Sequence, residues 1–144
     1  MSKGARRKRG AARWLAAASV VGALVAAPVS VLAHGTFQAH ARPPEFDSAA
    51  IRLVGSGGYR TERRHQQIRV TVCLRKRYGG RFFAVRCMTD YDSDRRVRAQ
   101  VSVPGCVEGV WRTTALGEAL GRGGEWSHAS FDASPRFVCP AGRG

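Results

Sequence analysis

Apolar and polar residues alternate most clearly between positions 68 and 103. From 68 to 74 every second residue is isoleucine, valine or leucine, with arginine, threonine and cysteine between them. This period of two is typical of a β-strand that buries one face. The alternation returns over 97–103, where valine and alanine alternate with arginine, glutamine and serine, so we expect another such strand there.

A β-hairpin is predicted directly after the first strand, because two glycines at its end supply the positive φ angles that tight turns require. We expect a three-residue loop over 79–81, which places Tyr78 opposite Phe82 and Cys73 opposite Cys87. A two-residue loop would miss the cysteine pairing by one position. The register and a disulfide between these cysteines therefore predict each other.

Turn residues divide the rest of the chain into short segments. A polar stretch over 34–48 has no periodicity and is expected to form a flexible leader. We expect glycines over 55–58 to end a strand over 49–54, aspartates to form a turn over 89–94, and glycines to form a loop over 116–124. The remaining strands are expected over 109–115, 125–131 and 136–139.

Seven short strands separated by turns predict an all-β domain over 49–140, an antiparallel β-sandwich of immunoglobulin-like architecture. The term describes architecture only, because antibody-type domains bridge two sheets whereas the first cysteine pair here lies in one hairpin. The chain has 144 residues and no internal repeat, so we expect no second domain.

The first 33 residues have the layout of a secretory signal peptide. Six basic residues up to Arg13 precede an apolar stretch over 14–33, which ends in small residues. We expect cleavage after Ala33 and a secreted, extracellular protein without stable membrane insertion. An uncleaved anchor is the alternative, but Pro28 and the low leucine content argue against it.

All four cysteines lie beyond this segment, and an even number in a small exported domain indicates two disulfides. Of the three pairings we favour Cys73–Cys87, which would staple the hairpin, and Cys106–Cys139, which would tie the last strand to the middle of the domain. A zinc site is the alternative, but no two cysteines have the short spacing of zinc-binding pairs.

The chain is strongly basic, with 24 lysines and arginines against 10 acidic residues. Six basic residues belong to the predicted signal peptide, so the mature chain would keep 18 against 10, a net charge of +8. This charge favours attraction to anionic wall polymers, phospholipid or nucleic acid. A preference for arginine over lysine is also typical of genes rich in G and C. On that interpretation the arginines reflect base composition and have no function.

Arginines in the predicted strands are the candidate site for an anionic ligand. Strand alternation places three of them on one side of the hairpin, and the fourth points outward from a later strand. The four candidates are Arg69, Arg75, Arg77 and Arg112. Trp111 and Trp126 are alternative surface contacts, but we expect both to lie in the core because the domain has few large apolar residues.

Asp90, Asp92 and Asp94 have a spacing that can surround a calcium ion. An EF-hand needs glycine and glutamate at later positions where this chain has arginine and valine. We therefore interpret the segment as an acidic turn whose carboxylates cap backbone amides and pair with Arg95 and Arg96, and we expect no metal or other cofactor.

His65 and His128 are the only histidines inside the predicted domain. Acid–base catalysis would need a carboxylate or nucleophile beside one of them. Ser130 and Asp132 lie near His128 in sequence, while Ser56 lacks the flanking residues of a nucleophile elbow. We expect no catalytic residue, although a ribonuclease-like pair of the two histidines stays open.

Four segments and the glycine turn of the hairpin resemble small secreted two-disulfide proteins of actinobacteria, most of them uncharacterised. The segments are VTVCL at 70–74, FFAVRC at 82–87, CVEGVWRT at 106–113 and SPRFVC at 134–139. The resemblance implies secretion and a β-sandwich-like fold. It implies no catalytic residues, because that group has no agreed activity.

The sequence thus predicts a secreted, monomeric, non-enzymatic domain that binds an unknown target or the cell surface. One alternative is a binder of anionic envelope polymers or nucleic acid through an arginine-rich face. The other is an inhibitor of secreted proteases, which would act on another secreted protein through the glycine-rich segment over 116–124 or the tail of the Cys106–Cys139 loop.

Overall fold

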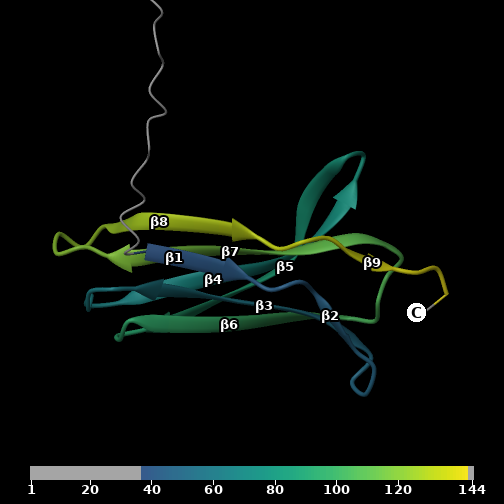
Figure 1. Ribbon diagram of the computed structural model, residues 1–144, viewed down its shortest axis with the longest axis horizontal. Helices are drawn as coiled ribbons and strands as arrows, with labels where there is room; N and C mark the ends of the chain where they lie inside the picture. Colours follow the sequence, from purple (N-terminus) through teal and green to yellow (C-terminus); the bar gives the residue numbers. More distant parts are fainter. Residues whose placement is uncertain (1–36, 143–144) are drawn as a thin grey trace, which may run out of the picture. The chain divides into compact units, whose positions relative to one another are not determined.

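The computed structural model describes residues 37–142, apart from the side chain of His128. These residues form two antiparallel β-sheets that pack against each other (Figure 1). This part of the chain contains nine strands and no helix, and hence no helix able to cross a membrane. The predicted signal peptide and its cleavage site at Ala33 lie outside the described residues.

Sheet A has four strands arranged around β3 (Arg52–Thr61). β6 (Arg96–Pro104) pairs with nearly the whole length of β3. β1 (Phe37–Ala41) pairs with residues 57–61 of β3, and β2 (Glu45–Asp47) pairs with residues 52–54. Since β6 occupies one edge of β3, β1 and β2 follow each other along its second edge.

Sheet B has five strands, and β4 (Ile68–Tyr78) lies between β5 (Arg81–Asp92) and β7 (Gly109–Leu120). The second edge of β7 is shared by β8 (Trp126–Ala133) and β9 (Phe137–Cys139). All pairings between the named strands of both sheets are antiparallel, which confirms the predicted antiparallel β-sandwich.

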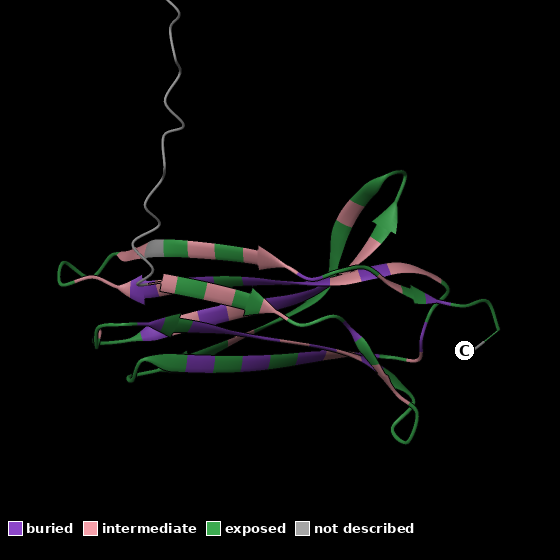
Figure 2. Cartoon of the chain, in the orientation of Figure 1, coloured by how far each residue is buried: buried purple, intermediate pink, exposed green. Residues whose placement is uncertain are grey.

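The core lies between the two sheets and follows the predicted alternation. Buried and exposed residues alternate along the strands, which Figure 2 shows as stripes. The four apolar residues of β4 over 68–74 have no exposed surface, and the apolar residues of β6 over 97–103 are also buried. Trp111 is 2% exposed, so it is a core residue, as expected.

The flexible leader predicted over 34–48 is wrong for residues 37–48, because β1 and β2 lie within them. Phe37, Ala39 and Ala41 are half-buried against the core, and Pro44 is buried. The segment is mostly polar, so its short alternation did not predict a strand. It forms strands because β3 provides a partner for pairing.

The glycines over 55–58 do not end a strand but lie in the middle of β3. An added Cβ at Gly55 would lie 2.9 Å from Leu74 Cδ2, and one at Gly57 would lie 3.1 Å from both Val72 Cγ2 and Ala115 Cβ. β3 therefore approaches sheet B so closely that its inward positions have no room for larger side chains.

The turn predicted over 89–94 and the loop predicted over 116–124 are mostly strand. β5 continues to Asp92, and β7 continues to Leu120 through an irregularity between Gly117 and Ala119. An added Cβ at Gly117 would overlap the Tyr59 ring, which packs directly on this glycine. Burial, together with the charge of Glu118, raises the pKa of Tyr59 to about 12.

The hairpin pairs Cys73 with Cys87 and forms the predicted disulfide, but the turn is not the predicted one. Tyr78 faces Arg81, so the loop consists of Gly79 and Gly80 alone, both with positive φ. A register shift beside Leu74 leaves Val85 without a partner, which is a β-bulge. The bulge supplies the one position by which a two-residue loop would otherwise miss the cysteine pairing.

The second disulfide joins Cys106 to Cys139 as predicted, and both cysteines are buried. It fixes β9 beside the start of β7, where Gly109 faces Cys139. The four cysteines are therefore all used in disulfides, and the zinc alternative does not apply.

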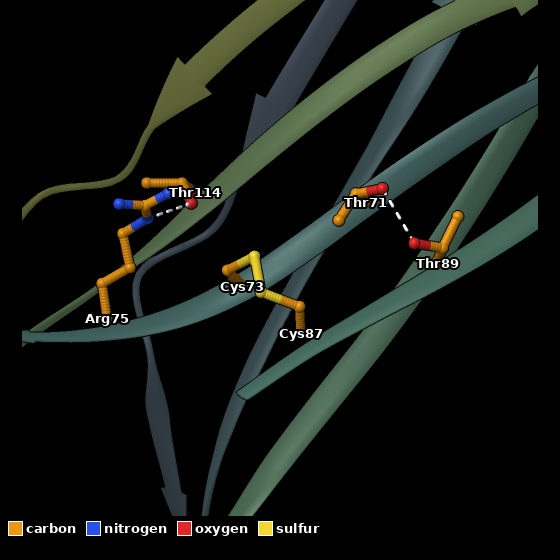
Figure 3. The surroundings of a disulfide bond; sticks show 6 residues. All are labelled: Thr71, Cys73, Arg75, Cys87, Thr89 and Thr114. Carbon is orange, nitrogen blue, oxygen red and sulfur yellow. Dashed lines mark hydrogen bonds between the residues drawn. A yellow bond between two sulfur atoms is a disulfide. The ribbon is translucent and has the colours of Figure 1, made fainter. Parts of the chain in front are cut away.

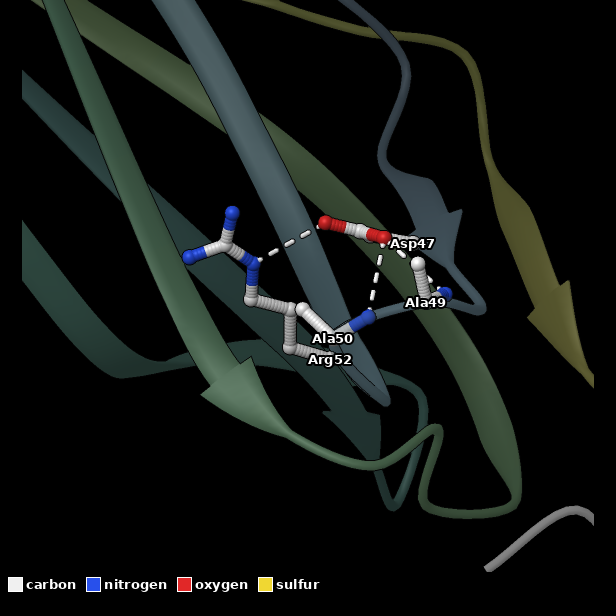
Figure 4. A network of polar contacts seen from close by, with 4 residues as sticks. All are labelled: Asp47, Ala49, Ala50 and Arg52. Carbon is white, nitrogen blue, oxygen red and sulfur yellow. Dashed lines mark hydrogen bonds and ion pairs between the residues drawn. The ribbon is translucent and has the colours of Figure 1, made fainter.

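A local network stabilises the connection between β2 and β3. The Asp47 carboxylate accepts hydrogen bonds from the backbone N–H groups of Ala49 and Ala50 and pairs with Arg52 (Figure 4). The bond from Ala50 is the main cause that holds the pKa of Asp47 below its ordinary value. The sequence pattern did not predict this turn.

We expect Gly117→Ala to lower the free energy of unfolding by about 1–3 kcal/mol, because the added methyl group would overlap the Tyr59 ring. Guanidinium unfolding followed by tryptophan fluorescence measures this difference. In a Tyr59→Leu background the same substitution should cost clearly less. An equal cost in both backgrounds would show that the contact with Tyr59 is not the reason for the glycine.

Deletion of Val85 should leave the Cys73–Cys87 disulfide in place, because it removes the bulge without moving Cys87 relative to Cys73. A non-reducing peptide map shows the linkage. If the loop instead had three residues with a regular ladder, the deletion would displace Cys87 and prevent the bond. Loss of the bond, with a loss of about 3 kcal/mol in stability, would contradict the observed register.

Candidate binding surfaces

The four predicted arginines all lie on the outer face of sheet B. Arg75 is paired with Arg112, and Arg69 and Arg77 share the face of Arg75 because they lie an even number of residues from it on β4. The Cys73–Cys87 disulfide is on the same face, where Figure 3 shows it near Arg75. The predicted face is therefore correct, but the four arginines do not have equivalent surroundings.

Arg69 differs from the other three arginines because it has an acidic partner. Its Nε donates a hydrogen bond of 2.8 Å to Glu118 Oε2, and its guanidinium lies 4.1 Å from the Trp126 ring centroid. The bond to Glu118 is the main cause that raises the pKa of Arg69. Because Glu118 neutralises its charge, Arg69 is a poor candidate for an anionic ligand. Trp126 is half-buried under it on the outer face, outside the core where we expected it.

Arg75 and Arg112 have no acidic partner among the described residues. Arg75 Nε donates a hydrogen bond to Thr114 Oγ1 (Figure 3). The Arg112 guanidinium lies 4.0 Å from the Phe82 ring centroid, a cation–π contact between β7 and the hairpin. These contacts orient both guanidinium groups and leave their positive charges uncompensated.

The tip of the β4–β5 hairpin stands away from the two sheets (Figure 1). Tyr78 and Phe83 are 53% and 52% exposed there, and their ring centroids are 6.2 Å apart. Lys76 Nζ lies 5.3 Å from the Tyr78 ring. We call the following residues the hairpin surface: Arg75, Lys76, Arg77, Tyr78, Arg81, Phe82, Phe83 and Arg112.

A second basic surface, which was not predicted from the sequence, lies on the outer face of sheet A. Arg60 of β3 pairs with Arg96 of β6, and Gly58 next along that face pairs with Arg98 on one side and His40 on the other. Alternation in β6 already indicated that Arg98 points outward. The surface could not be assembled from sequence, because His40 was placed in a flexible leader.

Asp90 and Asp92 accept hydrogen bonds from the local backbone and Asp94 forms an ion pair, so the three carboxylates do not share one centre. Asp90 accepts a hydrogen bond from the backbone N–H of Tyr91, and Asp92 accepts one from that of Asp94. Asp94 pairs with Arg64 at 3.7 Å, not with the arginines that follow it. Within residues 37–142 no group of three or more histidine, cysteine or acidic side chains is placed to hold a metal ion.

Ser130 and Asp132 attach β1 to the edge of β8. Ser130 Oγ accepts a hydrogen bond from the backbone N–H of Ala39, and Asp132 Oδ2 accepts one from that of Ala41. Both side chains thus take the place of a neighbouring strand for β1. Their polar atoms have a structural role that the sequence gave no means of seeing.

The remaining catalytic candidates in the described part of the chain are Ser56 and His65. The side chain of His128, and with it the predicted pair of histidines, lies outside the described residues. Ser56 lies on β3, with a side chain pointing to the outer face of sheet A. His65 is half-buried, with its ring 5.4 Å from that of Phe37. The segment over 116–120, considered as a reactive loop for a protease, is strand with partners on β4 and β8.

The chain matches no protein-family model, and no curated protein resembles it significantly.

Proposed function

We propose that this protein is exported and acts without catalysis, as a binding domain that attaches to anionic polymers of the cell envelope through the hairpin surface. The main support is the composition of the projecting hairpin. From 75 to 86 it carries five basic residues and no acidic one. None of the three ion pairs found within residues 37–142 includes a residue of the hairpin surface.

The charges of the hairpin suit a polymer better than a small anion. Arg75 and Arg77 lie on one face of the hairpin, and Lys76 lies on the opposite face. Cations distributed over both faces of a projecting element can contact several anionic groups along one chain. Each such contact releases counterions, so binding would weaken steeply as salt rises.

Exposed aromatic rings give the hairpin a second means of binding. Phe82 stacks under Arg112, while Tyr78 and Phe83 expose half of their surface to solvent. Aromatic rings beside cations can cover the apolar faces of sugar units while the cations bind the attached anionic groups. Envelope polymers that combine sugars with anionic groups present both features.

Export is supported by the two disulfides, which persist mainly in oxidising compartments. We expect protein recovered from culture medium to begin near His34, with both disulfides formed. An intact mass and a non-reducing peptide map measure these properties together. A full-length chain with free thiols, found only with the membrane fraction, would contradict export.

The double variant Arg77→Gln/Arg81→Gln tests the proposed surface, because both side chains are exposed and removing them should not disturb the core. We expect wild-type protein to co-sediment with bacterial cell-wall fragments at low salt and to be released as salt rises. The double variant should be released at clearly lower salt, with a slope of log K against log salt reduced by about 1.4–1.8.

The matched control is Arg63→Gln/Arg122→Gln, which removes the same charge from exposed positions away from the hairpin. It should behave like wild type. Equal weakening in both double variants would show that only net charge matters. No retention of the wild-type protein at low salt, or unchanged retention on fragments stripped of anionic polymers, would also contradict the proposal.

A further inference from the structure

A groove runs along β3 on the outer face of sheet A. Its floor is formed by Ser56 and the backbone of Gly57, while the imidazole of His40 lies over Gly58. β1 and β6 form its two walls, and it contains two adjoining cavities of about 600 and 440 Å³ that share His40 and Arg98. Small residues between longer side chains thus create a channel parallel to the strands.

The glycine at position 58 is needed for the shape of this groove. An added Cβ would lie 2.6 Å from His40 Cε1 and 2.9 Å from the Val97 carbonyl oxygen. Any larger residue would displace the imidazole from its place over the strand. The glycine-rich segment thus allows close sheet packing on its inner side and forms a groove on its outer side.

Four arginines surround the groove without an acidic partner among the described residues: Arg42, Arg60, Arg96 and Arg98. Arg60 and Arg96 are direct cross-strand neighbours. Like charges directly opposite each other destabilise a sheet. A bound anion would therefore reduce the repulsion between Arg60 and Arg96, which no described acidic side chain pairs with. Asp90 is the acidic residue on the lining, at the β5 side of the larger cavity.

We propose that this groove binds a linear chain of phosphate groups lying along β3. Guanidinium groups form paired hydrogen bonds with the oxygens of phosphate groups. Successive outward residues on a strand are about 6.8 Å apart, so Arg96 and Arg98 present charges at regular intervals along the groove. A chain of phosphates would meet both.

The lining favours a phosphate chain over single-stranded nucleic acid. Proteins that hold single strands usually stack the bases on aromatic rings. No phenylalanine, tyrosine or tryptophan is among the described residues that line the two cavities. The groove therefore has cations for the backbone of such a polymer, and the imidazole of His40 is the one aromatic ring among the described residues of its lining.

This site is independent of the proposed hairpin surface, which belongs to sheet B. The experiment therefore uses the full domain with Arg77→Gln/Arg81→Gln as background, so that the hairpin contributes little. Inorganic polyphosphate of defined length is titrated into this protein by calorimetry. Into the same background we place Arg96→Gln/Arg98→Gln, with Arg63→Gln/Arg122→Gln as the charge-matched control.

The groove variant should bind polyphosphate at least tenfold more weakly, while the control should lose less than threefold. Unchanged affinity in the groove variant, or equal losses in both, would overturn the proposal. Thermal unfolding of each variant shows whether the fold is kept. If the groove variant fails to fold, amide chemical shifts of the background protein decide: polyphosphate should shift residues 38–42, 56–60 and 96–100, and shifts elsewhere would overturn the assignment.

A single-stranded oligonucleotide with the same number of phosphates separates the two sources of phosphate. We expect it to bind more weakly than polyphosphate. Tighter binding of the oligonucleotide, lost in the groove variant, would assign the site to nucleic acid and overturn the preference for a chain without bases.

Discussion

The close approach of β3 to sheet B is the constraint on which the rest of the structure depends. Leu74 and Val72 of β4 fill the space that side chains at Gly55 and Gly57 would occupy. A sandwich of this size buries a modest core, so contact between the sheets along its whole length is needed for stability. Glycines usually weaken a strand, but here they permit the packing that holds both sheets together.

The same packing places most of the arginines on the outside of the domain. Because the inner faces of β3, β4, β6 and β7 are filled mainly by small or apolar residues, the arginines of these four strands occupy the outer faces of the two sheets. Glu118 neutralises Arg69, but the other three predicted arginines keep their charge. The two surfaces proposed for anions are therefore a consequence of how the core is built, with the aromatic hairpin and the glycine floor giving each its own shape.

The hairpin shows how one irregularity can satisfy two local preferences. Two adjacent glycines favour a two-residue turn, and two cysteines favour a disulfide across non-adjacent positions. A regular ladder could satisfy only one of them. The bulge at Val85 satisfies both, and a bulged strand bends and twists more strongly. This accords with the position of the hairpin tip, which leaves the sheet plane in Figure 1.

The sequence by itself determined the all-β class, the alternation of β4 and β6, both disulfide pairings and the face shared by Arg69, Arg75 and Arg77. These features follow from local periodicity and from cysteine positions, which depend little on distant partners. Only the tertiary structure decided the turn length, the strands of the supposed leader, the role of Ser130 and Asp132, and the groove along β3. Each of these depends on contacts between residues far apart in the chain. A polar segment becomes a strand only beside the strand that pairs with it, and a glycine becomes part of a groove only between neighbouring strands.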